Sequence, residues 1–176
     1  MNSSRASSSG TNILLYLLRR DLRITDNPIL HHLSTAQHNF THLLPVYVVP
    51  PHQVEVSGFL QDGQSSPYPE ARSRVGHFWR CGPHRAQWIA QSVWDVKQSL
   101  EQTNSGLLIR IGRFEQVVSD MLEGVNAKDG VKVGAVWMTK DDPSEEVDDE
   151  RAVADVCSEN DIPFKLWADE KYYVDE

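Results

Sequence analysis

The sequence predicts an α/β fold, a Rossmann-like, doubly wound, five-stranded parallel sheet flanked by helices. Five short runs rich in apolar and β-branched residues alternate with four segments of helical pattern. Each strand except the last is followed by a helix, which is the order of right-handed βαβ units. The longest apolar run has six residues, which suits a strand covered on both faces and is too short to span a membrane.

The first strand, Ile13–Leu18, is followed by a charged turn and a short helix. Asp26 is a residue type that can cap this helix, which we expect over Asn27–Leu33 with Pro28 in its first turn. The turn between strand and helix carries four charged residues, Arg19, Arg20, Asp21 and Arg23. Ligands of α/β sheets gather at such loops, at the carboxyl ends of the strands.

The second strand, Leu43–Val49, ends at two prolines. A long irregular segment, His52–Arg74, follows, and loops of this length inside compact domains are usually functional or mobile. Gly82 then marks the start of a long amphipathic helix that ends near Asn104–Gly106. Its apolar stripe has helical spacing and consists of Ile89, Val93, Val96 and Leu100.

Three further strands complete the predicted sheet. These are Leu107–Ile111, Val131–Met138 and Pro163–Trp167, with a helix over roughly Phe114–Leu122 between the first two. The last helix starts within the acidic run and extends to about Asn160. We expect the first strand of the chain to lie at the centre of the sheet.

Composition limits the possible classes of protein. At 176 residues and 20.0 kDa, the chain fits one domain, which we place at residues 12–176 after a Ser-rich, disordered tail at 1–11. A net charge of −8 argues against a surface devoted to nucleic acid. Two distant cysteines lack the spacing of a zinc site or a disulfide framework, which suits a reducing, intracellular compartment.

The common catalytic and cofactor motifs are absent. The sequence has no G-x-G-x-x-G after the first strand, no P-loop, no G-x-S-x-G and no histidine pair at metal-ligand spacing in a helix. We therefore assign no catalytic residue and no metal ligand. The five tryptophans are interpreted as core residues, including Trp88 and Trp94 on the long helix.

The arginines of the first turn allow two interpretations. They could receive an anion or polar ligand at the sheet edge. Alternatively, they pair within the chain, with Asp21, Asp26 or a carboxylate of the acidic run, and so hold neighbouring loops together. The second interpretation is favoured, because arginine and aspartate at turn spacing commonly form structural ion pairs.

The acidic run, DDPSEEVDDE, lacks the pattern of a calcium loop. Ser144 is expected to cap a helix, and carboxylates in its first turns complement the helix dipole. Asp148, Asp149 and Glu150 lie further along. One of them facing the sheet edge could accept hydrogen bonds from the amino and ring N–H groups of a heterocycle.

Five motifs in order resemble the amino-terminal domain of the photolyase/cryptochrome family, and specifically its DASH-type members. LLRRDLRITDNPIL is similar to the opening strand, turn and helix of that family, although Leu18 replaces the usual aromatic residue. The other matches are SRVGHFWRCGPHRAQWIAQSVWDVKQSL, LLIRIGRFEQVV, SEEVDDERAV and FKLWADEKYYVDE. Together they cover the chain from about Asn12 to its end.

The resemblance implies a light-driven flavoprotein that repairs cyclobutane pyrimidine dimers, preferring single-stranded DNA, or signals light. FAD would be held by a helical domain that follows this one and is absent here, so the fragment should be catalytically inactive. The domain present would help to bind an antenna folate, 5,10-methenyltetrahydrofolate. By the pattern V-x-E-R, Glu150 is the best match for the glutamate that binds the pterin ring, with Asp149 beside it and Glu146 as second candidate.

The partners that this resemblance implies are the folate, the FAD-binding helical domain and DNA reached through the parent protein, with no membrane. The alternative is a stand-alone nucleotide-binding α/β module of the universal-stress or electron-transfer-flavoprotein type. Such a module should have a Gly-rich loop late in the sheet. The late glycines are instead scattered, at Gly112, Gly124, Gly130 and Gly134.

Overall fold

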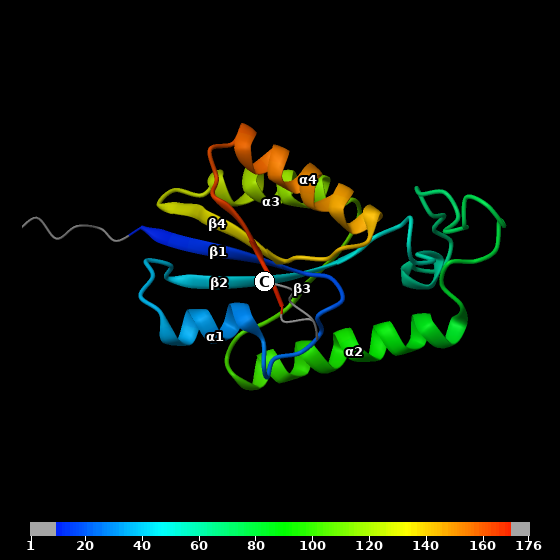
Figure 1. Ribbon diagram of the computed structural model, residues 1–176, viewed down its shortest axis with the longest axis horizontal. Coiled ribbons are helices and arrows are strands. Elements are labelled where there is room, and N and C mark those ends of the chain that lie inside the picture. Colours follow the sequence, from blue (N-terminus) through cyan, green and yellow to red (C-terminus); the bar gives the residue numbers. More distant parts are fainter. Residues whose placement is uncertain (1–9, 170–176) are drawn as a thin grey trace, which may run out of the picture.

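The computed structural model describes residues 10–169 and contains one parallel sheet of five strands in the order β3-β2-β1-β4-β5 (Figure 1). The predicted fold class and the central place of the first strand are confirmed. The strands are β1 (Thr11–Leu18), β2 (His42–Val49), β3 (Leu108–Ile111), β4 (Val131–Thr139) and β5 (Phe164–Trp167).

Helices cover both faces of the sheet. In Figure 1, α1 and α2 lie below the strands, and α3 and α4 lie above them. The helices are α1 (Pro28–Thr35), α2 (Pro83–Gln102), α3 (Phe114–Asn126) and α4 (Ser144–Glu159). Their order after the strands is the predicted one, and their ends fall within a few residues of the predicted ends, as is usual for boundaries read from sequence.

Alternate residues of β1 belong to two separate cores. Leu14, Tyr16 and Leu18 pack with the apolar faces of α1 and α2, whereas Leu15 and Leu17 pack with α3 and α4. Side chains of a strand alternate between the two faces of a sheet, so an unbroken apolar run is required only where both faces are covered. This explains the run of six apolar residues, Ile13–Leu18, in the first strand.

Two predicted helix caps are wrong. The side chain of Asn27, and not that of Asp26, caps α1 by accepting the backbone N–H groups of Ile29 and Leu30 at 3.1 and 3.0 Å. Asp26 has a positive φ of 56°, which places it in the turn before the cap. Ser144 is the first residue of α4, and Pro143 occupies the cap position without a side-chain hydrogen bond.

The segment between β2 and α2 is largely irregular, as predicted. It contains one short helix, η1 (Ser57–Phe59), and a single bridge between Arg72 and Trp79. It extends beyond the carboxyl ends of the strands, at the right of Figure 1. The first strand begins at Thr11, inside the predicted tail of residues 1–11; residues 1–9 of that tail and residues 170–176 lie outside the described range.

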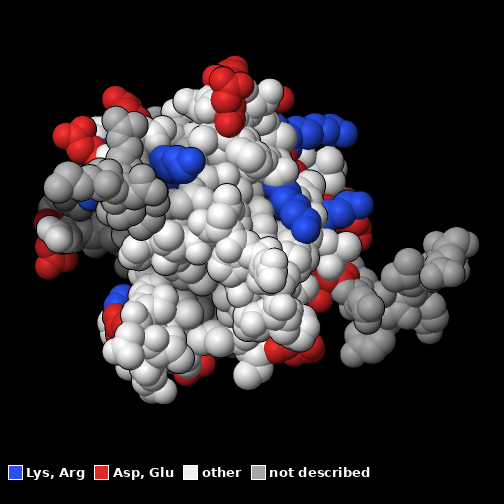
Figure 2. All heavy atoms as spheres, turned by 90° about the vertical axis from the view of Figure 1, so that its left-hand side faces the viewer, with Lys and Arg blue, Asp and Glu red and all other residues white. Residues whose placement is uncertain are grey.

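The two ends of the sheet differ in charge. Figure 2 shows the end at which the strands begin, where the described lysines, arginines and acidic residues are scattered over a mostly uncharged surface. At the other end, the arginines that follow β1 face the acidic first turns of α4. These ion pairs lie at the edge where ligands of α/β sheets bind.

Candidate functional site

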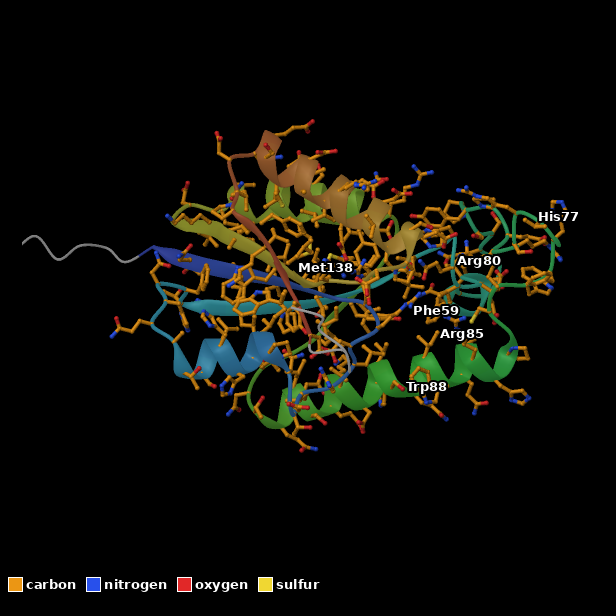
Figure 3. All side chains as sticks on the ribbon, viewed as in Figure 1. Phe59, His77, Arg80, Arg85, Trp88 and Met138 are labelled. Carbon is orange, nitrogen blue, oxygen red and sulfur yellow. The ribbon has the colours of Figure 1, made fainter. Side chains whose placement is uncertain are left out.

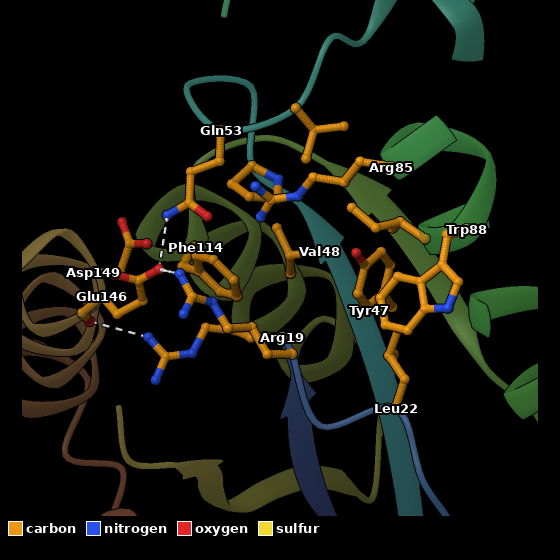
Figure 4. Close-up of a pocket in the computed structure, with 14 residues that line it drawn as sticks. Arg19, Leu22, Tyr47, Val48, Gln53, Arg85, Trp88, Phe114, Glu146 and Asp149 are labelled. Atoms are coloured by element: carbon orange, nitrogen blue, oxygen red, sulfur yellow. Dashed lines mark hydrogen bonds and ion pairs between the residues drawn. The ribbon is translucent and has the colours of Figure 1, made fainter. Parts of the chain in front are cut away.

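A cavity of about 470 Å³ lies at the carboxyl ends of β1 and β2, between the first turns of α4 and α2 (Figure 4). Its volume falls within the range of roughly 300–1,000 Å³ typical of small-ligand sites. Its lining is partly charged and partly apolar, and consists of Arg19, Arg20, Leu22, Tyr47, Val48, Pro50, Gln53, Val54, Arg85, Trp88, Ile89, Phe114, Glu146 and Asp149.

Helix α4 supplies the acidic wall of the cavity. Glu146 and Asp149 are three residues apart, so they lie on the same side of the helix. The Glu146 side chain is only 4% exposed. Its carboxylate accepts hydrogen bonds from the guanidinium of Arg20 and, at 3.4 Å, from the side-chain amide of Gln53. Glu146 is therefore already paired, although it lines the cavity.

Asp149 has no such partner. Its Oδ2 atom is buried and accepts no hydrogen bond from the described residues, and the nearest cationic candidate, Nε2 of His52, is 4.0 Å away. Burial raises the pKa of Asp149 to about 6; nearby Arg19 opposes this shift, whereas the neighbouring glutamates add to it. A carboxylate oxygen that lacks a hydrogen-bond donor can accept an N–H group from a ligand.

Glu150 faces a different direction. Its Oε1 accepts a hydrogen bond from Arg19 at 2.5 Å and from the backbone N–H of Asp141 at 2.8 Å. Both side chains of the Arg19–Glu150 pair are about 95% buried. Glu150 is not part of the cavity lining. Its predicted contact with a ligand stays a prediction, while the structure places its carboxylate in an ion pair between α4 and the end of β1.

The favoured interpretation of the first turn, in which its arginines pair with carboxylates of the same chain, is confirmed. Arg19 also donates to the backbone carbonyls of Thr139 and Glu146, at 2.8 and 3.0 Å. Arg23 pairs with Asp21 at 2.8 Å and also with Asp169. The turn therefore connects the end of β1 to α4 and to the residues after β5.

The wall opposite α4 is mainly apolar and aromatic, with Tyr47 and Val48 from β2 and Trp88 from α2 (Figure 4). Phe114, the first residue of α3, adds a further aromatic ring on the side of Glu146 and Asp149. Arg85 stands one helical turn before Trp88 and contributes a positive charge on the same side. The cavity thus offers carboxylates on one wall, flat apolar surfaces on another, and a cation from α2.

The prediction that all tryptophans pack in the core is wrong for three of them. Trp88 and Trp94 are 63% and 56% exposed, and Trp79 is 44% exposed, whereas Trp137 is 7% exposed. Trp88 and Trp94 each adjoin a residue of the apolar stripe on α2, and successive helical residues are turned by about 100°. The stripe faces the sheet, so its immediate neighbours do not.

Two lining residues, Gln53 and Arg85, were not singled out from the sequence, because polar residues of a loop and a helix start look alike whether or not they face a cavity. Three signals pointed to their regions: Gln53 lies in the long irregular segment, Arg85 lies in one of the family motifs, and residues that follow the central strands converge at one sheet edge. Within residues 10–169, no cluster of acidic, histidine or cysteine side chains could hold a metal ion, and no helix has the length and hydropathy needed to cross a bilayer.

Comparison with known proteins gives a consistent match. The DNA photolyase family model matches residues 14–174. The chain is 56% identical to a putative cryptochrome DASH of Gibberella zeae over 96% of its length, and 48% identical to a putative mitochondrial cryptochrome DASH of Neurospora crassa over 93%. It spans only 24% and 22% of those two relatives.

Solved structures agree at the level of the fold. A cryptochrome of Synechocystis superposes with a TM-score of 0.68 at 22% identity, over 92% of this chain and 28% of that one. An archaeal photolyase of Sulfolobus tokodaii with two FAD molecules gives a TM-score of 0.64 at 22% identity, over 89% and 29%. From the family match and the sheet that these structures share, the chain belongs to the DNA photolyase family and corresponds to the amino-terminal α/β domain of its DASH cryptochromes.

Proposed function

We propose that residues 12–176 form the antenna domain of a DASH-type cryptochrome or photolyase, and that its cavity binds 5,10-methenyltetrahydrofolate. The observation that carries this proposal is the buried, unpartnered Oδ2 of Asp149 in a cavity with aromatic walls. When bound, such a folate would supply near-ultraviolet absorption. The chain's own residues would bind and orient it.

The residues present fit the chemistry of a folate. Its pterin ring presents an amino group and a ring N–H side by side, which match a carboxylate acceptor. Asp149 offers an unpaired oxygen, and Glu146 lies one turn away on the same side of α4. Trp88 and Phe114 provide flat surfaces for a ring, and Arg85 provides a partner for the carboxylates of the folate tail.

The proposal changes the roles of the three candidate carboxylates. Asp149 is the proposed main acceptor, and Glu146 is a second acceptor held in place by Arg20 and Gln53. Glu150, the residue favoured from sequence, is proposed to act indirectly, because its pair with Arg19 fixes the start of α4 against β1. Removing the charge of Glu150 would then shift Asp149. It would not remove a direct contact with the ligand.

The activities of the longer protein are proposed from the family match. The chain spans about a quarter of its curated relatives. We propose that a following helical domain holds FAD, and that light-driven repair of cyclobutane dimers in single-stranded DNA, or light signalling, needs that domain. The isolated chain should then show no repair. We also propose an intracellular location.

The test is the near-ultraviolet absorbance of bound folate in the longer protein, compared between wild type and three variants. Asp149→Asn replaces one acceptor oxygen by an amide donor, so we expect folate to bind at least about tenfold more weakly. Glu150→Gln should have a smaller effect on affinity and a larger one on stability. Glu159→Gln, at the exposed end of α4, is the matched control and should bind normally.

Full folate absorbance in the Asp149→Asn protein would show that Asp149 is not the acceptor of the pterin N–H groups. If wild-type protein acquires no folate band when supplied with the folate, the antenna proposal itself fails. The isolated 176-residue chain is expected to bind folate weakly, because the antenna site of the family is completed by the helical domain. Tight binding by this chain alone would contradict that part of the proposal.

A further inference from the structure

A second cavity, of about 480 Å³, lies on the opposite side of α2 from the first and shares no lining residue with it. It is bounded by η1, by the segment around Trp79 and by the first two turns of α2. Along α2, Arg85, Trp88 and Ile89 face the first cavity. The residues that face the second are Pro83, Ala86, Gln87 and Ala90, which project from the other side of the helix.

The second cavity contains one charge. None of its lining residues is a lysine, arginine or histidine, and Glu55 is its single ionisable acid. Oε1 of Glu55 accepts the backbone N–H of Ser57 at 3.0 Å. Oε2 is buried and has no hydrogen-bond partner among the described residues. A buried carboxylate oxygen without a donor is costly and calls for a cationic or N–H-bearing partner.

Two aromatic side chains form walls of this cavity. Phe59 extends from η1 toward α2 (Figure 3), and Trp79 lies near the end of the irregular segment, just before α2. The guanidinium carbon of Arg72 is 3.9 Å from the centroid of the Trp79 ring, and Nη1 of Arg72 donates to the carbonyl of His77 at 3.0 Å. Trp79 is therefore held in place before any ligand arrives.

The floor of the cavity is made of small residues. Ala86 and Ala90 lie one turn apart on α2, and buried Cys81 lies just before the helix. Small side chains leave room for an apolar body beside the helix, between the two aromatic walls. Glu70 offsets the positive charge of Arg72 beside the cavity, because its carboxylate pairs with Nε of Arg72 at 2.6 Å.

We propose that this second cavity binds a small organic ammonium ion with an aromatic or branched aliphatic body. The cation would pair with Oε2 of Glu55 and be attracted to the faces of Trp79 and Phe59, while the body would cover Ala86 and Ala90. An anion would be repelled by Glu55, and a neutral ligand without a donor would leave Oε2 unpaired. This site is independent of the proposed folate site.

The test uses three probes with the same phenylethyl body on the 176-residue chain: 2-phenylethylamine, 2-phenylethanol and 3-phenylpropionate. Binding is followed by NMR through the five indole N–H signals, with the Trp79 signal identified in a Trp79→Phe variant. We expect the amine to shift the Trp79 signal and leave the Trp88 signal unchanged. The alcohol and the acid should bind at least about tenfold more weakly.

Two variants and one control distinguish binding in this cavity from non-specific binding of the amine to the protein. Glu55→Gln keeps an acceptor for the Ser57 N–H but removes the charge, so the amine should bind about tenfold or more weakly. Ala86→Leu fills the floor and should abolish binding. Glu159→Gln makes the same change of charge far from the cavity and should bind as wild type does.

Equal binding of the amine and the alcohol would overturn the proposal, as would unchanged affinity in Glu55→Gln. A shift of the Trp88 signal instead of the Trp79 signal would place the amine in the first cavity and also reject this site. Folate binding does not enter the measurement, so failure here leaves the antenna proposal untouched, and the reverse also holds.

Discussion

Asp149 and Glu150 are adjacent on α4, yet their surroundings are opposite. Glu150 is enclosed with Arg19, and its carboxylate is satisfied by that guanidinium and by a backbone N–H. Asp149 lines a cavity and has a buried oxygen with no partner. A turn of about 100° along the helix separates an acid that holds the fold together from one that is available to a ligand.

The comparison makes Arg19 the residue whose loss should matter most. Arg19→Met would leave the Glu150 carboxylate buried and unpaired and would remove the donor to two backbone carbonyls. Breaking such a buried pair typically costs about 3–5 kcal/mol. We expect a loss of that size in the free energy of unfolding, measured by urea denaturation.

The double variant Arg19→Met/Glu150→Met shows how much of the stability lost in Arg19→Met comes from leaving a buried charge unpaired and how much from lost packing. It removes both charges, so it should recover part of the stability lost in Arg19→Met. If the single variant is as stable as wild type, the structural role given to this pair is wrong.

Asp149 should behave in the opposite way. Its folded pKa of about 6 lies above the ordinary value of 3.8 because burial disfavours the carboxylate. The folded chain therefore binds more protons between those pH values, and this group lowers stability as pH rises. Allowing for partial solvent screening, Asp149→Asn should stabilise the protein at pH 7 by about 1–2 kcal/mol.

That gain should shrink as the pH falls below 6, where the folded wild-type aspartate takes up its proton, and should vanish below about 3.8, where the unfolded chain is protonated too. Urea titrations of both proteins at pH 7 and pH 4.5 give the comparison. A gain that is the same at both pH values would show that the effect does not come from the charge of Asp149.

Arg20 provides an intermediate case. It pairs with the same helix through Glu146, whose side chain is buried, but the Arg20 side chain is 54% exposed. Water and Gln53 can replace part of the lost interaction. We expect Arg20→Met to cost about 1 kcal/mol in the urea assay, which is clearly less than Arg19→Met. Equal costs would mean that burial of the arginine does not set the strength of these pairs.

The smallest effect is expected on the outer side of α4. Arg151 and Asp148 form an ion pair at 3.4 Å, with both side chains more than 70% exposed. Exposed pairs contribute between about 0 and 1 kcal/mol. Arg151→Met should therefore change the free energy of unfolding by less than about 0.5 kcal/mol. A loss comparable to that of Arg20→Met would contradict the order proposed here.

The sequence predicted the sheet well because strand signals in a covered parallel sheet are strong. A run such as Ile13–Leu18 has few alternatives to a buried strand. It could not predict which of two capping residues starts α1, since Asp26 and Asn27 are both good caps and only the backbone conformation separates them.

The same limit applies to the candidate site. The acidic run was correctly identified as a helix start at the sheet edge, but the choice between Asp149 and Glu150 depends on the rotation of α4 against β1. That rotation depends on contacts of the folded chain, including the pair of Glu150 with Arg19, 131 residues earlier, and the burial of Val153 and Cys157. The exposed Trp88 could not be distinguished from the buried Trp137 by residue type, because tryptophan suits both a core and a ligand-facing wall.

The central position of β1 has a consequence for the order in which the chain is made. Among the five strands of this sheet, β1 is synthesised before the others; it pairs with β2 and, on its other edge, with β4, whose residues Val131–Thr139 emerge more than a hundred residues later. Until then an apolar strand edge has no partner, and such edges favour association between chains. A nascent chain that stalls before β4 would therefore expose an apolar strand edge that is buried in the finished sheet, and we expect such stalled chains to associate more readily than complete ones.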